Sequence, residues 1–130
     1  MLDTTSAVIN TFFMKIRNFE IFELHSEYCR VFSNPKRLMI LALLNKREMS
    51  VGEIAECIGV PLATVSQHLS VLRTKHVVEA RKEGQTVFYR PTDPRLMDAC
   101  TLIRTVLLDG MKKRGEIALE INADGIIMDE

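Results

Sequence analysis

The region from Gly59 to Arg90 constrains the fold most strongly, because its apolar residues change their spacing halfway along. In the first half the spacing is helical, and one side of the helical wheel collects the apolar residues Leu62, Val65, Leu69 and Leu72. From Val77 onward, apolar and polar residues alternate on both sides of Glu83-Gly84. This pattern predicts two short strands joined by a tight turn. We therefore expect a helix that is followed directly by a β-hairpin.

The opposite face of the same predicted helix is small, polar and uncharged. It consists of Ala63, Thr64, Gln67, Ser70 and Thr74, with Ser66 at its edge. No acidic residue occurs from Leu62 to Val78, whereas a helix kept soluble by its surface usually carries Glu and Lys. Small side chains let a backbone approach DNA bases closely, and a glutamine amide can both donate to and accept from adenine. Such a face is typical of a helix that enters the major groove.

The segments around this helix favour the same interpretation. A short helix is predicted over residues 51–58, and Gly59-Val60-Pro61 supplies the tight turn of a helix-turn-helix. The hairpin carries basic and polar side chains near its tip and would form a wing that contacts DNA. The expected DNA contacts are Ala63, Thr64, Ser66, Gln67, Ser70, Arg73, Arg81, Lys82 and Gln85. The alternative is that these are ordinary surface residues, which would leave the order of helix-turn-helix and basic wing unexplained.

The rest of the chain is predicted to be mostly helical. Asn34-Pro35 marks the start of a core helix, and Asp93-Pro94 supplies an N-cap and a first helical residue for a long last helix. Residues 46–50 form a polar break, and residues 116–130 fit either a frayed helix or a small hairpin. The expected fold class is mainly α with a β-hairpin wing, in the order helix, helix, short helix, helix, hairpin, helix. Three parts are expected: a helical N-terminal extension for dimerisation over 1–24, a winged helix-turn-helix over 25–111 and an acidic tail over 112–130.

Charge is unevenly distributed along the 130 residues, although the formal net charge is zero. Residues 26–114 carry 15 Lys and Arg against nine Asp and Glu, a net of +6, while residues 115–130 carry five acids and no base. A basic middle segment is compatible with a polyanionic partner such as DNA. The acidic tail and the Phe-rich N-terminal segment would also suit a winged helix that binds only proteins, which is the alternative function.

Other classes of protein are disfavoured by what the sequence lacks. It has no secretory signal and no apolar run long enough to span a membrane. Three widely spaced cysteines without a CxxC motif favour a reducing, cytoplasmic location. We find no glycine-rich phosphate loop, no HExxH and no nucleophile elbow, so we expect neither an enzyme nor a cofactor.

Three blocks, "FSNPKRLMILALL", "SVGEIAECIGVPLATVSQHLSVLR" and "VVEARKEGQTVFYRPTDP", resemble the ArsR/SmtB family of bacterial winged-helix repressors over about residues 25–110. The resemblance implies a homodimer formed by the first and last helices, with one recognition helix per subunit in a major groove of an operator. It implies release by an inducer, often a metal, a metalloid or a thiol modification. Carried onto this chain, the recognition helix is about Leu62–Arg73 and the wing about Val77–Arg90, with bases read by Ala63, Thr64, Ser66 and Gln67.

The same resemblance does not identify an inducer site on this chain. The arsenic-type cysteine positions hold Ser50 and Gly52 here, and none of the three histidines, His25, His68 and His76, lies on the last helix, where the zinc-type site needs ligands. The cysteines that some relatives use for reactive sulfur align near Ala42 and Leu108.

Cys29 and Cys100 fall on the two helices that pack together in this family. They would serve as a thiol switch, as a soft-metal site together with His25, or as small apolar fillers. All three interpretations remain open at this point, and the inducer is unknown.

Overall fold

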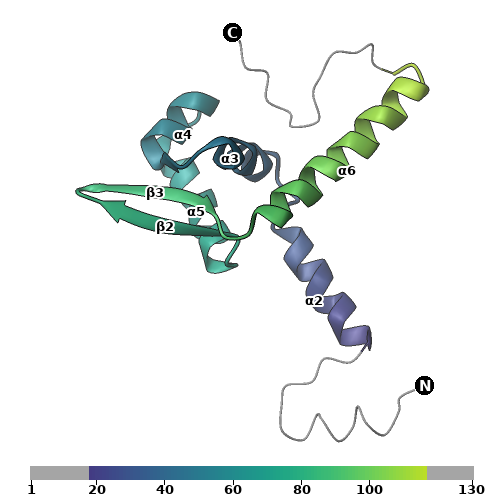
Figure 1. Ribbon diagram of the computed structural model, residues 1–130, viewed down its shortest axis with the longest axis horizontal. Coiled ribbons are helices and arrows are strands. Elements are labelled where there is room, and N and C mark those ends of the chain that lie inside the picture. Colours follow the sequence, from purple (N-terminus) through teal and green to yellow (C-terminus); the bar gives the residue numbers. More distant parts are fainter. Residues whose placement is uncertain (1–17, 117–130) are drawn as a thin grey trace, which may run out of the picture. The chain divides into compact units, whose positions relative to one another are not determined.

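The computed structural model describes residues 18–116, which form helices and a small antiparallel sheet (Figure 1). The chain divides into two compact units, residues 1–33 and 34–130. The first contributes α2 (Asn18–Arg30). The second contributes α3 (Pro35–Lys46), β1 (Met49–Ser50), α4 (Val51–Ile58), α5 (Leu62–Thr74), β2 (Val78–Glu83), β3 (Thr86–Pro91) and α6 (Pro94–Lys113). This order confirms a mainly helical, winged helix-turn-helix fold, while residues 1–17 of the expected helical extension and the acidic tail beyond 116 lie outside the described residues.

Two helices begin at capping hydrogen bonds made by the residues that the sequence predicted as helix starts. The Asn34 side chain accepts hydrogen bonds from the backbone N–H groups of Lys36, at 2.9 Å, and Arg37, at 3.1 Å, and Pro35 begins α3. The Asp93 carboxylate accepts one from the N–H of Arg95 at 3.0 Å at the start of α6. Each cap satisfies N–H groups that the first turn of a helix leaves without an intrahelical partner. Both expected helix starts are confirmed.

One strand, β1, is absent from the sequence-based expectation, which placed only a polar break at residues 46–50. Met49 pairs with Tyr89 and Ser50 with Phe88, so β1 lies beside β3 and the sheet order is β1-β3-β2. Met49 is almost fully buried. A strand of two residues is too short to show alternation, so the polar residues around Met49 concealed it. Because β1 pairs with β3, β3 is the central strand of the sheet.

The core of the second unit lies between the helices and one face of the sheet. Its buried apolar side chains are Ile40, Leu41, Leu44, Met49, Ile54, Val65, Leu69, Leu72, Val77, Val78 and Met97. Burying each of the larger ones stabilises the fold by about 1.5–3 kcal/mol. These contacts hold α5 and the sheet in a fixed relation to one another.

Helix α2 continues without a break across residues 24 and 25, so the proposed extension and the start of the winged domain share one helix. None of its side chains is buried, and Phe19 and Phe22 are among its exposed apolar residues. None of the helices within residues 18–116 is both long and apolar enough to cross a membrane.

Candidate nucleic-acid interface

The two faces of α5 have different environments. Val65, Leu69 and Leu72 are fully buried, as the spacing predicts. On the outer face the candidate contacts Ala63, Ser66, Gln67, Ser70 and Arg73 are exposed, and Thr64 is half-buried. Leu62 differs from the expectation, because 57% of it is exposed. Leu62 is the first residue of the helix. A helical wheel places it beside the buried residues, but the buried side chains of α5 begin one turn later, at Val65. The outer face is therefore available to a groove of DNA.

The turn before α5 depends on a left-handed glycine. Gly59 has φ of 69°, and its N–H donates to the carbonyl of Ala55 at 2.9 Å, which closes the end of α4. The carbonyl of Pro61 then accepts from the N–H groups of Thr64 and Val65. The chain reverses over three residues, because glycine adopts this φ without steric cost. This turn sets the angle at which α5 leaves α4.

The end of α5 is closed in a similar way without a glycine. His76 has φ of 61° and donates its N–H to the carbonyl of Arg73, while the N–H of Val77 reaches the carbonyl of Leu72 at 2.8 Å. This pair of bonds is a Schellman motif. It turns the chain directly from the recognition helix into β2.

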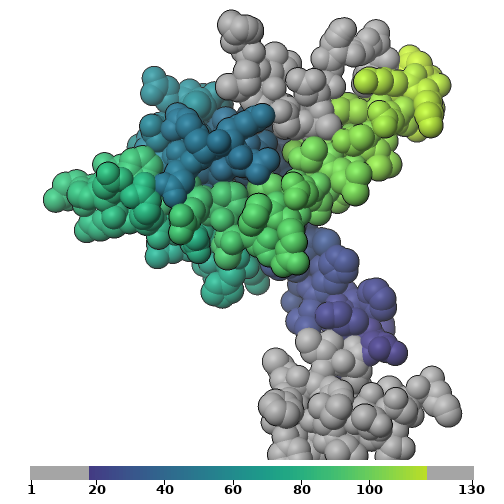
Figure 2. All heavy atoms as spheres, viewed as in Figure 1, coloured from purple at the N-terminus to yellow at the C-terminus, as the bar shows by residue number. Residues whose placement is uncertain are grey.

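The wing is a hairpin whose tip protrudes from the second unit (Figure 2). Its strands pair from Val78 with Pro91 to Glu83 with Thr86, which leaves a two-residue loop at Gly84 and Gln85. Gly84 has φ of 63°, and a glycine in this first loop position is typical of a type II′ turn.

The register has a consequence for the two expected basic contacts of the wing. Arg81 and Lys82 are neighbours on β2, so they point to opposite faces of the sheet. Lys82 shares its face of the sheet with the buried Val78, but it lies at the exposed end of the strand. Arg81 lies on the other face, where it forms ion pairs with Glu48 and Glu83. The structure therefore does not bring these two side chains together.

A positive edge that the sequence analysis missed lies where α3 begins beside α5. The pKa of His68 is lowered, first by its partial burial and then by the positive charges of Arg37 and Lys36. Both of these residues belong to the first turn of α3, which is far from α5 in the sequence. The sequence "NPKR" shows two basic residues just after a helix start. Only the packing of α3 against α5 places them near α5. We add them to the candidate phosphate contacts.

The two candidate sensing cysteines lie in different units. Cys29 is exposed on α2, where it borders a shallow depression with Phe22 and His25. Cys100 is half-buried on α6 and lines a small cavity between α3 and α6 together with Ala42. Within residues 18–116, no three His, Cys, Asp or Glu side chains are grouped as metal ligands would be. A role for Cys29 and Cys100 in sensing remains a prediction.

Comparison with known proteins agrees with this geometry. Residues 34–80 match the model of the family described as "Bacterial regulatory protein, arsR family". An uncharacterised HTH-type transcriptional regulator of Mycobacterium tuberculosis is 31% identical over 106 residues, which are 81% of this chain and 93% of that protein. The biofilm growth-associated repressor of Xylella fastidiosa is 36% identical over 77 residues, or 59% of this chain and 68% of that protein. The chain spans only 55% and 49% of the lengths of two other relatives that are 42% and 45% identical.

Solved structures extend the likeness to the fold. The crystal structure of the Mycobacterium tuberculosis regulator has a TM-score of 0.67 and 33% identity, and the match covers 72% of this chain and 95% of that one. A homodimeric winged helix-turn-helix DNA-binding domain from Mycobacterium bovis gives 0.68 and 29%, with 75% and 90% covered. The family and these relatives are transcriptional regulators rather than enzymes, as expected from the sequence. This chain therefore belongs to the arsR family of bacterial regulatory proteins.

Proposed function

We propose that this protein is a homodimeric, sequence-specific repressor that an inducer releases from its operator. The observation that carries the proposal is the outer face of α5, whose side chains are mostly small, uncharged and exposed, with Arg73 near its end, while the inner face is buried. The protruding wing beside it supplies a second point of contact. A repressor of this kind acts on the chromosome and hence in the cytoplasm.

Within this function, the side chains of α5 divide between bases and phosphates. Gln67 would read a base edge, and Ala63 would allow close approach. Thr64, Ser66 and Ser70 would donate to bases or phosphates, and Arg73 would bind a phosphate near the end of the helix. On the wing, Lys82, Gln85 and Arg81 would contact the backbone or minor groove. The positive edge of Lys36 and Arg37 would add to the phosphate contacts.

Dimerisation is supported by apolar side chains that lie in solvent. Helix α6 exposes Leu102, Ile103, Val106 and Leu107. These residues recur at spacings of three and four and would form a helix–helix seam. The Mycobacterium bovis relative is described as homodimeric. A two-fold dimer predicts an inverted-repeat operator with half-sites about one helical turn apart. Exposed Phe19 and Phe22 on α2 would add to the dimer surface.

Induction would use thiol chemistry at Cys29 and Cys100. In this proposal an oxidant or a polysulfide links the two thiols, and the resulting strain moves the recognition helices. Exposure of Cys29 and partial exposure of Cys100 are compatible with attack by such reagents. The alternative, a soft metal held by His25, Cys29 and Cys100, has no grouped ligand side chains to support it within residues 18–116.

The experiment is fluorescence anisotropy with DNA from upstream of the protein's own gene at one fixed salt concentration. Reduced protein is compared with protein treated with a polysulfide donor. Tight binding that treatment abolishes, but that persists in a Cys29→Ser/Cys100→Ser variant, is the expected result. Tight binding that treatment does not change would keep the repressor and reject the thiol switch. No binding to any DNA would favour the protein-interaction module instead.

A further inference from the structure

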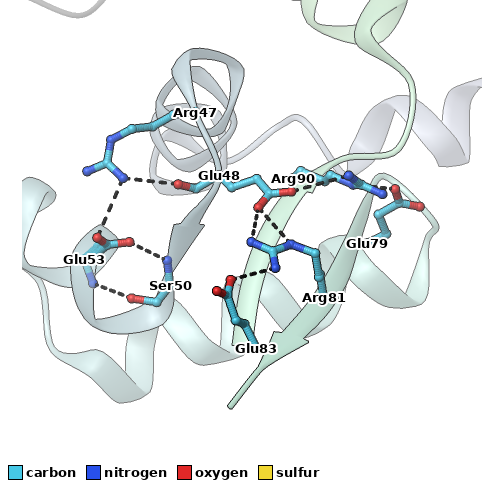
Figure 3. Close-up of polar contacts among 8 residues, drawn as sticks. All are labelled: Arg47, Glu48, Ser50, Glu53, Glu79, Arg81, Glu83 and Arg90. Carbon is cyan, nitrogen blue, oxygen red and sulfur yellow. Dashed lines mark hydrogen bonds and ion pairs between the residues drawn. The ribbon is translucent and has the colours of Figure 1, made fainter. Parts of the chain in front are cut away.

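One face of the wing carries five charged side chains that come from three segments of the sequence (Figure 3). Glu79, Arg81 and Glu83 alternate along β2 and therefore share a face, and Arg90 is paired with Glu79 across the sheet. Glu48, which precedes β1, reaches the same face. We call these five residues the charged wing face. Acids and bases alternate along it in the order Glu79, Arg90, Glu48, Arg81 and Glu83.

Glu48 is the centre of this network. Its Oε1 accepts from Nε of Arg81 at 3.1 Å and from Nη2 at 2.7 Å, and its Oε2 accepts from Nη1 of Arg90 at 3.4 Å. Its side chain is 29% exposed, less than any other in the network. The hydrogen bond from Arg81, followed by the charges of both arginines, lowers the pKa of Glu48. One carboxylate thus holds an arginine from each strand of the hairpin.

These contacts leave Arg81 little capacity for another anion. Its Nε and Nη2 donate to Glu48, its Nη1 donates to Glu83 at 2.8 Å, and its guanidinium carbon lies 5.1 Å from the centre of the Phe88 ring. The Nε of Arg90 is similarly held by Glu79 at 2.7 Å. A DNA phosphate must compete with a carboxylate for the donors of Arg81 that these bonds occupy, and three acids on the charged wing face outnumber two bases.

We propose that Glu48 limits sequence-independent DNA binding, because it holds Arg81 away from the phosphates of DNA that α5 does not fit. This inference rests on the proposed function as a DNA-binding regulator. Non-specific binding derives almost entirely from phosphate contacts, so an arginine that stays bound to a carboxylate adds little to it. Operator binding also uses base contacts of α5 and therefore depends less on Glu48. In this view Glu48 is a residue that sets specificity without touching a base.

The test compares Glu48→Gln with Glu56→Gln in binding to a random-sequence duplex and to the operator, over a series of salt concentrations. Glu56 is exposed on α4 and lies outside the network, so its variant gives the same change in charge within the second unit. We expect Glu48→Gln to bind random DNA about threefold more tightly or better, since a surface ion pair no longer competes. The slope of log K against log salt should steepen by about 0.9 for each new phosphate contact. Glu56→Gln should leave the slope unchanged.

A double variant identifies the arginine through which Glu48 acts. Glu48→Gln/Arg81→Gln should bind random DNA like the parent protein, and Arg81→Gln alone should change that binding little. The inference is wrong if Glu48→Gln binds random DNA like the parent, if Glu56→Gln gives an equal gain with an equal slope, or if the gain survives loss of Arg81. If neither the parent nor Glu48→Gln binds any DNA, the proposed function fails together with it. Thermal unfolding of each variant checks that the fold is retained.

Discussion

His76 occupies a backbone conformation that most helices reserve for glycine. A φ of 61° places its Cβ against the backbone, and a residue other than glycine in this region costs about 1 kcal/mol or more. The position is the C′ residue of the Schellman motif that joins α5 to β2. Nothing in the sequence marks it, because histidine is compatible with either a helix or a loop. Only the hydrogen bonds of the turn show where the strain lies.

We therefore predict that His76→Gly stabilises the protein by about 0.5–1 kcal/mol, since the strain that is relieved exceeds the extra entropy of the unfolded chain. Urea unfolding followed by circular dichroism measures the change. His76→Ala is the matched control, because it removes the imidazole but keeps the strained φ. An increase that is equally large in His76→Ala would show that the imidazole, and not the backbone, was the cause.

A second prediction at this scale concerns Asp93, whose pKa is lowered from 3.8 to about 2 by hydrogen bonds from the side chain and then the backbone of Arg95. A carboxyl group with a lowered folded-state pKa contributes stability that is complete above its unfolded pKa and is lost as the pH falls through the folded value. Asp93→Asn retains an N-cap oxygen but cannot ionise. We expect the parent to melt at a higher temperature than Asp93→Asn at pH 7, with the difference shrinking between about pH 4 and pH 2. A difference that does not vary with pH would contradict the assignment.

Among the elements, α5 was the one that the sequence described best. The spacing of Val65, Leu69 and Leu72 predicted its buried face correctly, because residues three or four positions apart in the sequence lie on the same face of a helix. The charged wing face could not be predicted in the same way. Glu48 and Arg81 are 33 residues apart, and Glu48 and Arg90 are 42 apart. Their contact depends on β1, an element too short to leave a pattern. Local periodicity thus identified the helices and the hairpin, while the pairing of distant charges required the fold.

The two faces of α5 should have separable roles. Leu69→Ala is expected to cost about 2–5 kcal/mol of unfolding free energy, because it opens a cavity in the core. Gln67→Ala should leave the free energy of unfolding nearly unchanged and reduce discrimination between the operator and a site with an altered base by about 1–3 kcal/mol. Urea unfolding and competition binding measure the two effects. Equal operator discrimination by the parent and Gln67→Ala would exclude Gln67 as a base-reading residue.

At the scale of the whole molecule, the proposed dimer determines whether the two recognition helices act together. Ile103 lies at the centre of the exposed apolar face of α6 and is 69% exposed. A charge at this position would be buried without a partner in a dimer but would lie in water in a monomer.

We predict that Ile103→Asp converts the protein to a monomer and weakens operator binding by at least about 100-fold, because two half-sites are no longer bound together. Analytical ultracentrifugation gives the mass, and anisotropy gives the affinity. Ile103→Met keeps the apolar face and should behave like the parent. A monomeric parent protein would contradict the proposed dimer, and a dimeric Ile103→Asp variant would place its interface elsewhere.

The two-residue loop at Gly84 and Gln85 limits how this wing can change its length. Side chains alternate strictly between the two faces of the hairpin. One residue inserted into β2 would therefore move each side chain beyond the insertion to the opposite face. Residues of β2 beyond the insertion, such as Arg81 and Glu83, would then point to the opposite face from Glu48 and Arg90. Two inserted residues would restore the faces and simply extend the reach of the tip along DNA. Viable length variants of this hairpin should therefore differ from one another by even numbers of residues in each strand.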